Sequence, residues 1–112
     1  MNFKNFLYKA DEEFNDILKS FNTNDITSIN KKVFEDGLSY VANINKNNQT
    51  SKIINDIITY NSAEKYYDNS YNYQLIYGWC SINESNNSYR VEYFISDVDK
   101  LKENLIPILK IK

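Results

Sequence analysis

At the start of the chain, apolar residues recur every three or four residues, and charged residues lie between them. This spacing places the apolar side chains on one face of an α-helix. Charged residues such as Lys9, Glu13 and Asp16 fall on the other face. We therefore predict a first helix. Its apolar face comprises Phe3, Phe6, Leu7, Ala10, Phe14, Ile17, Leu18 and Phe21.

A polar stretch, Asn22 to Asp25, interrupts this pattern and offers N-cap residues for a second helix. Apolar residues then recur again at steps of mostly three and four. We predict that the second helix carries Ile26, Ile29, Val33, Phe34, Leu38 and Val41. Gly37 would lie within this helix, where a glycine costs roughly 1 kcal/mol relative to alanine, so it would mark the close approach of another element.

A third helix follows the polar, Asn-rich connection from Asn43 to Thr50, with Thr50 or Ser51 as its cap. Its apolar residues come in two pairs, and an extension through Ala63 to Tyr67 is compatible with the pattern. The pairs are Ile53, Ile54, Ile57 and Ile58. Their β-branched side chains also suit a strand. The spacing of four between the pairs favours the helix, because period two does not explain it.

From Asn69 the hydrophobic period changes to two, which is typical of a β-strand. The aromatic residues of this first run share one face: Tyr71, Tyr73, Tyr77 and Trp79, together with Leu75. A second run alternates in the same way and carries Tyr89, Val91, Tyr93 and Ile95. The turn-rich segment from Asn83 to Ser88 separates the two runs. We therefore predict a β-hairpin.

The segment that begins at Ser96 resembles a capping box and predicts a last helix through Val98, Leu101 and Leu105, which ends or kinks at Pro107. The predicted element order is α-α-α-β-β-α, and the fold class is α+β. At 112 residues the chain has the length of one domain that buries its own core. We therefore treat residues 1–112 as a single compact domain.

Composition excludes several classes of site. The chain has no histidine and one cysteine, so the usual zinc ligand sets and any His-assisted nucleophile are absent. The two glycines, Gly37 and Gly78, lie too far apart for a phosphate-binding loop. We interpret Cys80 as a small buried apolar residue. We expect no enzymatic activity, no metal and no cofactor.

Residues encoded by A/T-rich codons, namely Asn, Lys, Ile and Tyr, dominate the composition. This bias indicates a low-GC genome of a bacterium, a phage or a plasmid. No window approaches the roughly 18 apolar residues of a membrane span, and the N-terminus lacks the apolar stretch of a signal peptide. We expect a cytoplasmic protein without a membrane partner.

The aromatic hairpin has two interpretations, as core under the helices or as a binding surface. Tyrosine hydroxyls need partners when they are buried, and tyrosine is enriched at protein interfaces. The candidate protein-binding residues are Tyr66, Tyr67, Tyr71 and Tyr73. The leading functional hypothesis is a small non-enzymatic protein that binds another protein. A phage- or plasmid-encoded inhibitor, or an immunity protein, would act in this way by steric occlusion.

The alternative hypothesis follows from the element order, which is that of a winged helix-turn-helix with a C-terminal dimerisation helix. On this interpretation the chain is a dimeric DNA-binding regulator or plasmid-maintenance factor, and residues 83–88 form the wing. Its candidate DNA contacts are Lys46, Lys52, Asn55, Thr59, Asn61, Lys65 and Arg90.

A net charge of −2 and a wing that carries Glu84 and no basic residue argue against strong phosphate binding. The two hypotheses predict different surfaces. DNA binding needs the basic candidates on one face with acidic residues excluded, whereas protein binding needs clustered, exposed tyrosines amid mixed charge. A homodimer through the first and last helices is compatible with either hypothesis.

Overall fold

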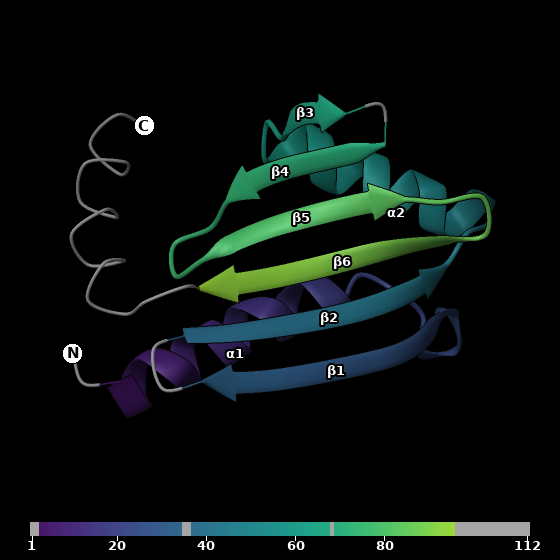
Figure 1. Ribbon diagram of the computed structural model, residues 1–112. Coiled ribbons are helices and arrows are strands. Elements are labelled where there is room, and N and C mark those ends of the chain that lie inside the picture. The colour runs from purple at the N-terminus through teal and green to yellow at the C-terminus, as the bar shows by residue number, and fades with distance from the viewer. Residues whose placement is uncertain (1–2, 35–36, 68, 96–112) are drawn as a thin grey trace.

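Two helices cover one face of a six-stranded antiparallel sheet in the computed structural model, which describes residues 3–34, 37–67 and 69–95 (Figure 1). In Figure 1, α1 runs behind β1 and β2, and α2 runs behind the opposite side of the sheet. The elements in chain order are α1 (Phe3–Leu18), the 3-10 turn η1 (Thr23–Asp25), β1 (Ile26–Phe34), β2 (Gly37–Asn45), α2 (Asn48–Tyr60), β3 (Glu64–Tyr67), β4 (Ser70–Gln74), β5 (Trp79–Glu84) and β6 (Ser88–Ile95).

The strand order is β1-β2-β6-β5-β4-β3, and all neighbouring strands are antiparallel. The hairpin of β1 and β2 forms one side of the sheet. Helix α2 then carries the chain across to the far edge, where the meander from β3 to β6 begins. This meander returns to pair β6 with β2, so β6 joins the two sides. Strands β1 and β3 are the two edges.

The predicted α-α-α-β-β-α layout is wrong, and with it the winged-helix arrangement, because the second predicted helix is the hairpin of β1 and β2. Apolar residues in β2 alternate strictly and point to the helices: Leu38, Tyr40, Ala42 and Ile44. In the edge strand β1, nearly all side chains are exposed. Burial therefore does not impose a period of two there, and the spacing of its apolar residues mimics a helix. The predicted last helix lies outside the described residues.

Helix α1 confirms the first prediction, and α2 confirms the helical interpretation of the third segment. The cap of α2 is Asn47 rather than Thr50 or Ser51. The Asn47 side chain accepts a hydrogen bond from the Thr50 amide, and the Thr50 hydroxyl accepts one from the Asn47 amide. The extension to Tyr67 is wrong. The helix ends at Tyr60, and Ser62 adopts a left-handed conformation (φ 51°) that turns the chain into β3.

The runs predicted as a hairpin do pair, as β5 and β6, but the first run is two strands rather than one. A turn separates β4 from β5, closed by a hydrogen bond of 2.8 Å from the Leu75 amide to the Gly78 carbonyl. Because of this turn, Tyr73 and Trp79 lie on opposite faces. Tyr73 pairs with Cys80 on the helix-covered face, whereas Trp79 pairs with Gln74 on the other face. The predicted single aromatic face therefore does not exist.

The core lies between the helices and a row of residues that crosses the middle of the sheet. Tyr40, Tyr93, Cys80 and Tyr73 are neighbours in this row. Phe14 of α1 packs on it, with ring centroids 5.4 Å from Tyr40 and 6.0 Å from Tyr93. Contacts of this kind between aromatic rings add to the free energy gained from apolar burial. The aromatic residues of this row are therefore core.

Glu13 fixes helix α1 to the sheet. Its carboxylate accepts hydrogen bonds from the Tyr93 hydroxyl (2.6 Å) and from the backbone amides of Ile76 and Tyr77 (3.0 and 3.1 Å). Burial raises the pKa of this carboxyl above 4.5, and the three hydrogen bonds partly offset that effect. The helical pattern had placed Glu13 on the solvent face. It instead anchors the turn between β4 and β5.

Candidate protein-binding surface

Three strongly exposed tyrosines lie where the chain passes from α2 into the edge strand β3. Tyr60 is 89% exposed, Tyr67 77% and Tyr66 60%. Figure 1 shows β3 at the edge of the sheet, beside α2. We call Tyr60, Tyr66 and Tyr67 the tyrosine edge. Exposed aromatic side chains that lie close together in the chain are candidates for contact with a partner.

The end of α2 positions the tyrosine edge. The Asn61 amide and side chain both donate hydrogen bonds to the Ile57 carbonyl, and the Ala63 amide donates one to the Ile58 carbonyl. These bonds satisfy carbonyls that the helix end would leave free. The left-handed Ser62 then reverses the chain direction. Tyr60 and β3 are thus held by a short, hydrogen-bonded connection.

Within β3, Tyr66 donates a hydrogen bond of 3.2 Å to the Glu64 carboxylate. This bond raises the pKa of Tyr66, because the nearby negative charge disfavours a phenolate. The tyrosine therefore stays neutral and presents a flat ring with a polar tip. Glu64 and Lys65 give the strand both signs of charge. Aromatic residues are enriched at protein interfaces, and the rim around them is polar.

An open groove of about 400 Å³ adjoins Tyr60. Its walls come mainly from α2, and its apolar lining is provided by Ile53 and Ile57. Both isoleucines are half-buried. A groove next to an exposed aromatic ring is a shape into which an apolar side chain of a partner fits.

The four tyrosines predicted as binding residues divide between surface and interior. Tyr66 and Tyr67 are exposed. Tyr71 is half-buried, with the Lys65 ammonium 6.0 Å from its ring centroid. Tyr73 is only 4% exposed and belongs to the core. Tyr60 was missed, because the helical pattern left open whether it would be buried.

The second edge of the sheet, β1, also exposes apolar residues. Ile29, Val33 and Phe34 are each about half exposed. Nine residues long, β1 shows one register shift, between Ile26 and Ser28, and regular pairing from Ser28 to Phe34. By contrast, β3 has four residues and a register shift within them.

Two of the predicted DNA contacts are paired with acidic residues. Lys46 forms an ion pair with Glu84, and this hydrogen bond raises the pKa of the Lys46 ammonium. Arg90 forms an ion pair of 2.8 Å with Glu92 on the same strand. These carboxylates would repel a DNA phosphate that approached either basic side chain.

The remaining predicted DNA contacts do not form a basic surface. Lys52, Asn55 and Thr59 are exposed along one side of α2, where Asp56 is exposed as well. The Asn61 side chain is used in capping α2. Lys65 lies on β3, over the ring of Tyr71. The predicted DNA-contacting residues therefore do not form a purely basic surface: Asp56 lies among them, and the Asn61 side chain caps the helix.

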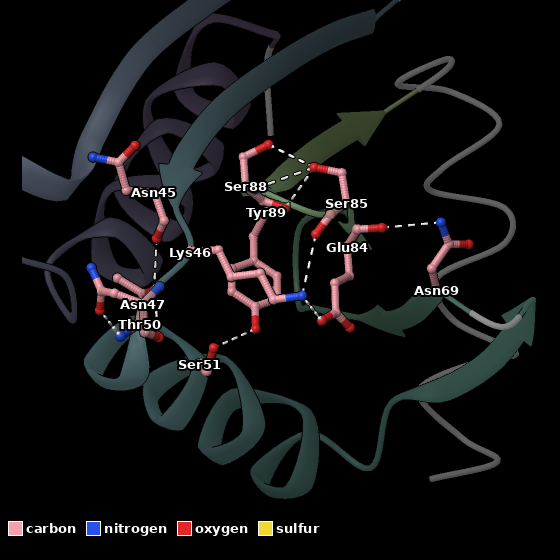
Figure 2. A network of polar contacts seen from close by, with 10 residues as sticks. All are labelled: Asn45, Lys46, Asn47, Thr50, Ser51, Asn69, Glu84, Ser85, Ser88 and Tyr89. Atoms are coloured by element: carbon pink, nitrogen blue, oxygen red, sulfur yellow. Dashed lines mark hydrogen bonds and ion pairs between the residues drawn. The ribbon is translucent and has the colours of Figure 1, made fainter.

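A polar cleft of about 320 Å³ lies between α2 and the sheet, near the start of the helix. Figure 2 shows its polar groups paired with one another: Lys46 contacts Glu84, and the Ser51 and Tyr89 hydroxyls lie 2.7 Å apart. Its floor is apolar, with Ile54, Ile58 and Ile82. Because the polar groups already satisfy each other, we interpret the cleft as a junction that joins α2 to β5 and β6.

The same junction holds the proposed wing, the turn between β5 and β6. The Lys46 amide donates to the Asn87 carbonyl (3.0 Å), and its ammonium donates to the Ser85 carbonyl (3.3 Å), as Figure 2 shows for the latter. The Asn69 side chain donates to the Glu84 carbonyl (3.0 Å). The turn is therefore packed against neighbouring loops rather than projecting as a wing.

The single cysteine of the chain, Cys80, lies in the core. Cys80 is fully buried, and burial raises the pKa of its thiol to about 12, so it stays protonated. In residues 3–34, 37–67 and 69–95, no three Cys, Asp or Glu side chains gather closely enough to hold a metal ion. Within the same ranges, neither helix is long and apolar enough to cross a membrane.

No family model, curated protein or solved structure matches this chain significantly.

Proposed function

We propose that this chain is a small non-enzymatic protein that binds another protein through its tyrosine edge. The single observation that carries the proposal is the exposure of Tyr60, Tyr66 and Tyr67, of which Tyr60 lines a groove with an apolar lining. By covering a functional surface of the partner, the chain would block that surface sterically. This mode of action requires no catalytic group.

Tyrosine suits this task for a physical reason. Its ring offers a large contact area but has few rotatable bonds, so little conformational entropy is lost when it is immobilised. Its hydroxyl forms a hydrogen bond at the rim of the contact. In the tyrosine edge, the bond from Tyr66 to Glu64 already orders one ring before a partner arrives.

The composition adds the biological setting of the proposal. Codons rich in A and T indicate a low-GC bacterial, phage or plasmid genome. A small inhibitor or an immunity protein encoded by such a genome would act by binding one protein partner. We therefore propose a phage- or plasmid-encoded inhibitor or an immunity protein, with its partner in the cytoplasm of a low-GC bacterium.

No observation favours the DNA-binding alternative. Its argument rested on the winged-helix element order, which the six-stranded sheet replaces. Two of its basic candidates are paired with carboxylates. A salt-dependent binding assay against random double-stranded DNA tests what is left of it, because phosphate contacts weaken steeply as salt rises.

The proposal is tested by affinity capture with matched variants. The tagged chain is incubated with a lysate of a low-GC bacterium, the captured protein is identified and purified, and its dissociation constant is measured. We expect Tyr66→Ser with Tyr67→Ser to raise the dissociation constant at least about tenfold, or about 1.4 kcal/mol. Tyr8→Ser is the control, because Tyr8 is equally exposed but lies on α1.

Two outcomes would contradict the proposal. In the first, the double variant and the Tyr8→Ser control bind the purified partner as tightly as the original chain. In the second, the chain binds DNA at low salt with a steep salt dependence, and the double variant binds it unchanged.

A further inference from the structure

Strand β1 leaves one side of its backbone without a neighbouring strand in the described part of the chain, since β1 ends the strand order. Alternate residues of such a strand direct their amides and carbonyls outward, where they can pair with another strand. Nine residues span about 30 Å at the usual rise of a strand. An edge this long, regular and apolar is open to strand addition.

The face of β1 that lies toward α1 combines two apolar residues with one charged residue. Ile29, Lys31 and Val33 share this face, because each pairs with a helix-facing residue of β2. Ile29 and Val33 are about half exposed. This face of the edge strand therefore presents exposed apolar side chains on either side of Lys31.

The central Lys31 is neutralised within its own chain. Its ammonium lies 2.6 Å from the Asp11 carboxylate and 3.3 Å from the Asn15 side-chain oxygen. The same ammonium sits 5.3 Å from the ring centroid of Tyr40. Lys31 is therefore drawn toward α1 and away from the outer edge, so its charge does little to keep another strand from the helix-facing side of this edge. Lys32 carries its charge on the opposite face.

From these observations we propose that two copies of the chain form a homodimer by antiparallel pairing of β1 with β1. The dimer extends the sheet across a two-fold axis through Lys31. This axis is distinct from the tyrosine edge, so the inference stands independently of the proposed function.

The register of this pairing follows from the sequence of β1. With the axis at Lys31, Ile29 of each copy lies opposite Val33 of the other on the helix-facing side. On the opposite face, Asn30 lies opposite Lys32. A two-fold axis perpendicular to the sheet keeps both α1 helices on the same side. A shift by one residue would instead set the helix-facing residues of one copy against the other face.

A second copy fits this edge better than an unrelated strand for two reasons. The β1 pattern is matched to itself about Lys31, since apolar residues stand two positions away on either side. In this register the two Lys31 side chains lie opposite each other, and the ion pair with Asp11 in each copy reduces the repulsion between their charges. The other edge, β3, lacks such a pattern because it is short and its register is shifted.

Sedimentation velocity of the full chain, from micromolar concentrations upward, tests the proposal. We expect a concentration-dependent shift from the monomer to twice its mass. Ile29→Lys should weaken the dimer at least about tenfold, because it places a lysine opposite Val33 and beside Lys31 of the other copy. Ile76→Lys is the matched control, because Ile76 is similarly exposed but lies in the turn between β4 and β5.

A second variant tests the register. When Ile29→Lys is mixed with Val33→Glu, a lysine faces a glutamate at one end of the pairing, so a tagged Ile29→Lys chain should capture Val33→Glu and should not capture itself. A wild-type chain that stays monomeric at all concentrations would overturn the proposal. So would a dimer that Ile29→Lys and Ile76→Lys affect equally, or a mixture in which capture is not restored. Circular dichroism establishes that each variant is folded.

Discussion

Strand β6 at the centre of the sheet and strand β1 at its edge are nearly equal in length but differ in burial. In β6, buried residues alternate with exposed or half-buried ones, and four side chains are buried: Tyr89, Val91, Tyr93 and Ile95. In β1, every side chain after the first is exposed. The centre therefore supplies most of the free energy of folding, whereas the exposed side chains of the edges contribute little to it and remain accessible to a partner.

The position of the helices explains this difference. Phe14 of α1 packs on Tyr40 and Tyr93, so the buried face of α1 lies against β2 and β6. Of β1, the described contacts to α1 run through Lys31, which reaches Asp11 and Asn15. Helix α2 meets the opposite side of the core through the buried Ile54 and the hydrogen bond between the Ser51 and Tyr89 hydroxyls. The side chains of both edge strands are left almost entirely exposed.

The two edges differ from each other as well. The edge at β3 is short, and its register is interrupted, which disfavours strand addition. It instead exposes aromatic rings that suit a side-chain contact. The edge at β1 is long and regular and suits backbone pairing. The molecule thus has two surfaces of different chemistry, separated by the full width of the sheet.

A pair of identical truncations gives the largest expected difference between centre and edge. Ile82 and Ile29 belong to one row across the sheet, but Ile82 is 1% exposed and Ile29 49%. We expect Ile82→Ala to lower the free energy of unfolding by about 2–5 kcal/mol, because it leaves a cavity in the core. Ile29→Ala should cost less than about 1 kcal/mol.

Urea denaturation at concentrations where the chain is monomeric measures both values. Similar losses for the two variants would contradict the contrast between centre and edge.

A smaller effect on the free energy of unfolding is expected from Glu13, which contacts the central strand β6 through Tyr93. Burial raises its pKa in the folded protein above 4.5, so the folded state holds the proton more tightly than the unfolded state. Its contribution to stability is therefore greatest below the unfolded pKa, and it is lost as the pH rises through the folded pKa. Glu13→Gln removes this titration.

The free energy of unfolding of the wild type minus that of Glu13→Gln should thus decrease as the pH rises from acid to neutral. The change should be well below the effect of Ile82→Ala. It is measured by thermal or urea unfolding of both proteins across that range. A difference that increases with pH would contradict the raised pKa.

The sequence predicted those elements whose hydrophobic period is set by burial. Helix α1 was recognised because Ala10, Phe14 and Leu18 are all buried on one face. The hairpin of β1 and β2 was missed because the exposed apolar residues of β1 fall at helical spacing by coincidence. Its signal was present in β2, where Leu38, Tyr40, Ala42 and Ile44 occupy every second position, but Val41 between them obscures the alternation.

The candidate site was predictable only in part, for a similar reason. We expected Tyr66, Tyr67 and Tyr71 at the surface; Tyr66 and Tyr67 are exposed, whereas Tyr71 is half-buried. Tyr73 was placed with them, but its strand directs it into the core. The anchoring role of Glu13 depends on the turn between β4 and β5, more than sixty residues away in the chain. Helical periodicity carries no information about such a contact.

Hydrogen exchange of the wild-type chain, followed strand by strand at low and high protein concentration, tests most directly the claim that the centre stabilises and the edges bind. We expect amides in β2, β5 and β6 to exchange only by global unfolding and those in β3 to exchange by local opening. Amides in β1 should exchange fast in dilute solution and become protected as the concentration rises. Protection of β1 and β3 equal to that of β6 at every concentration would contradict the claim.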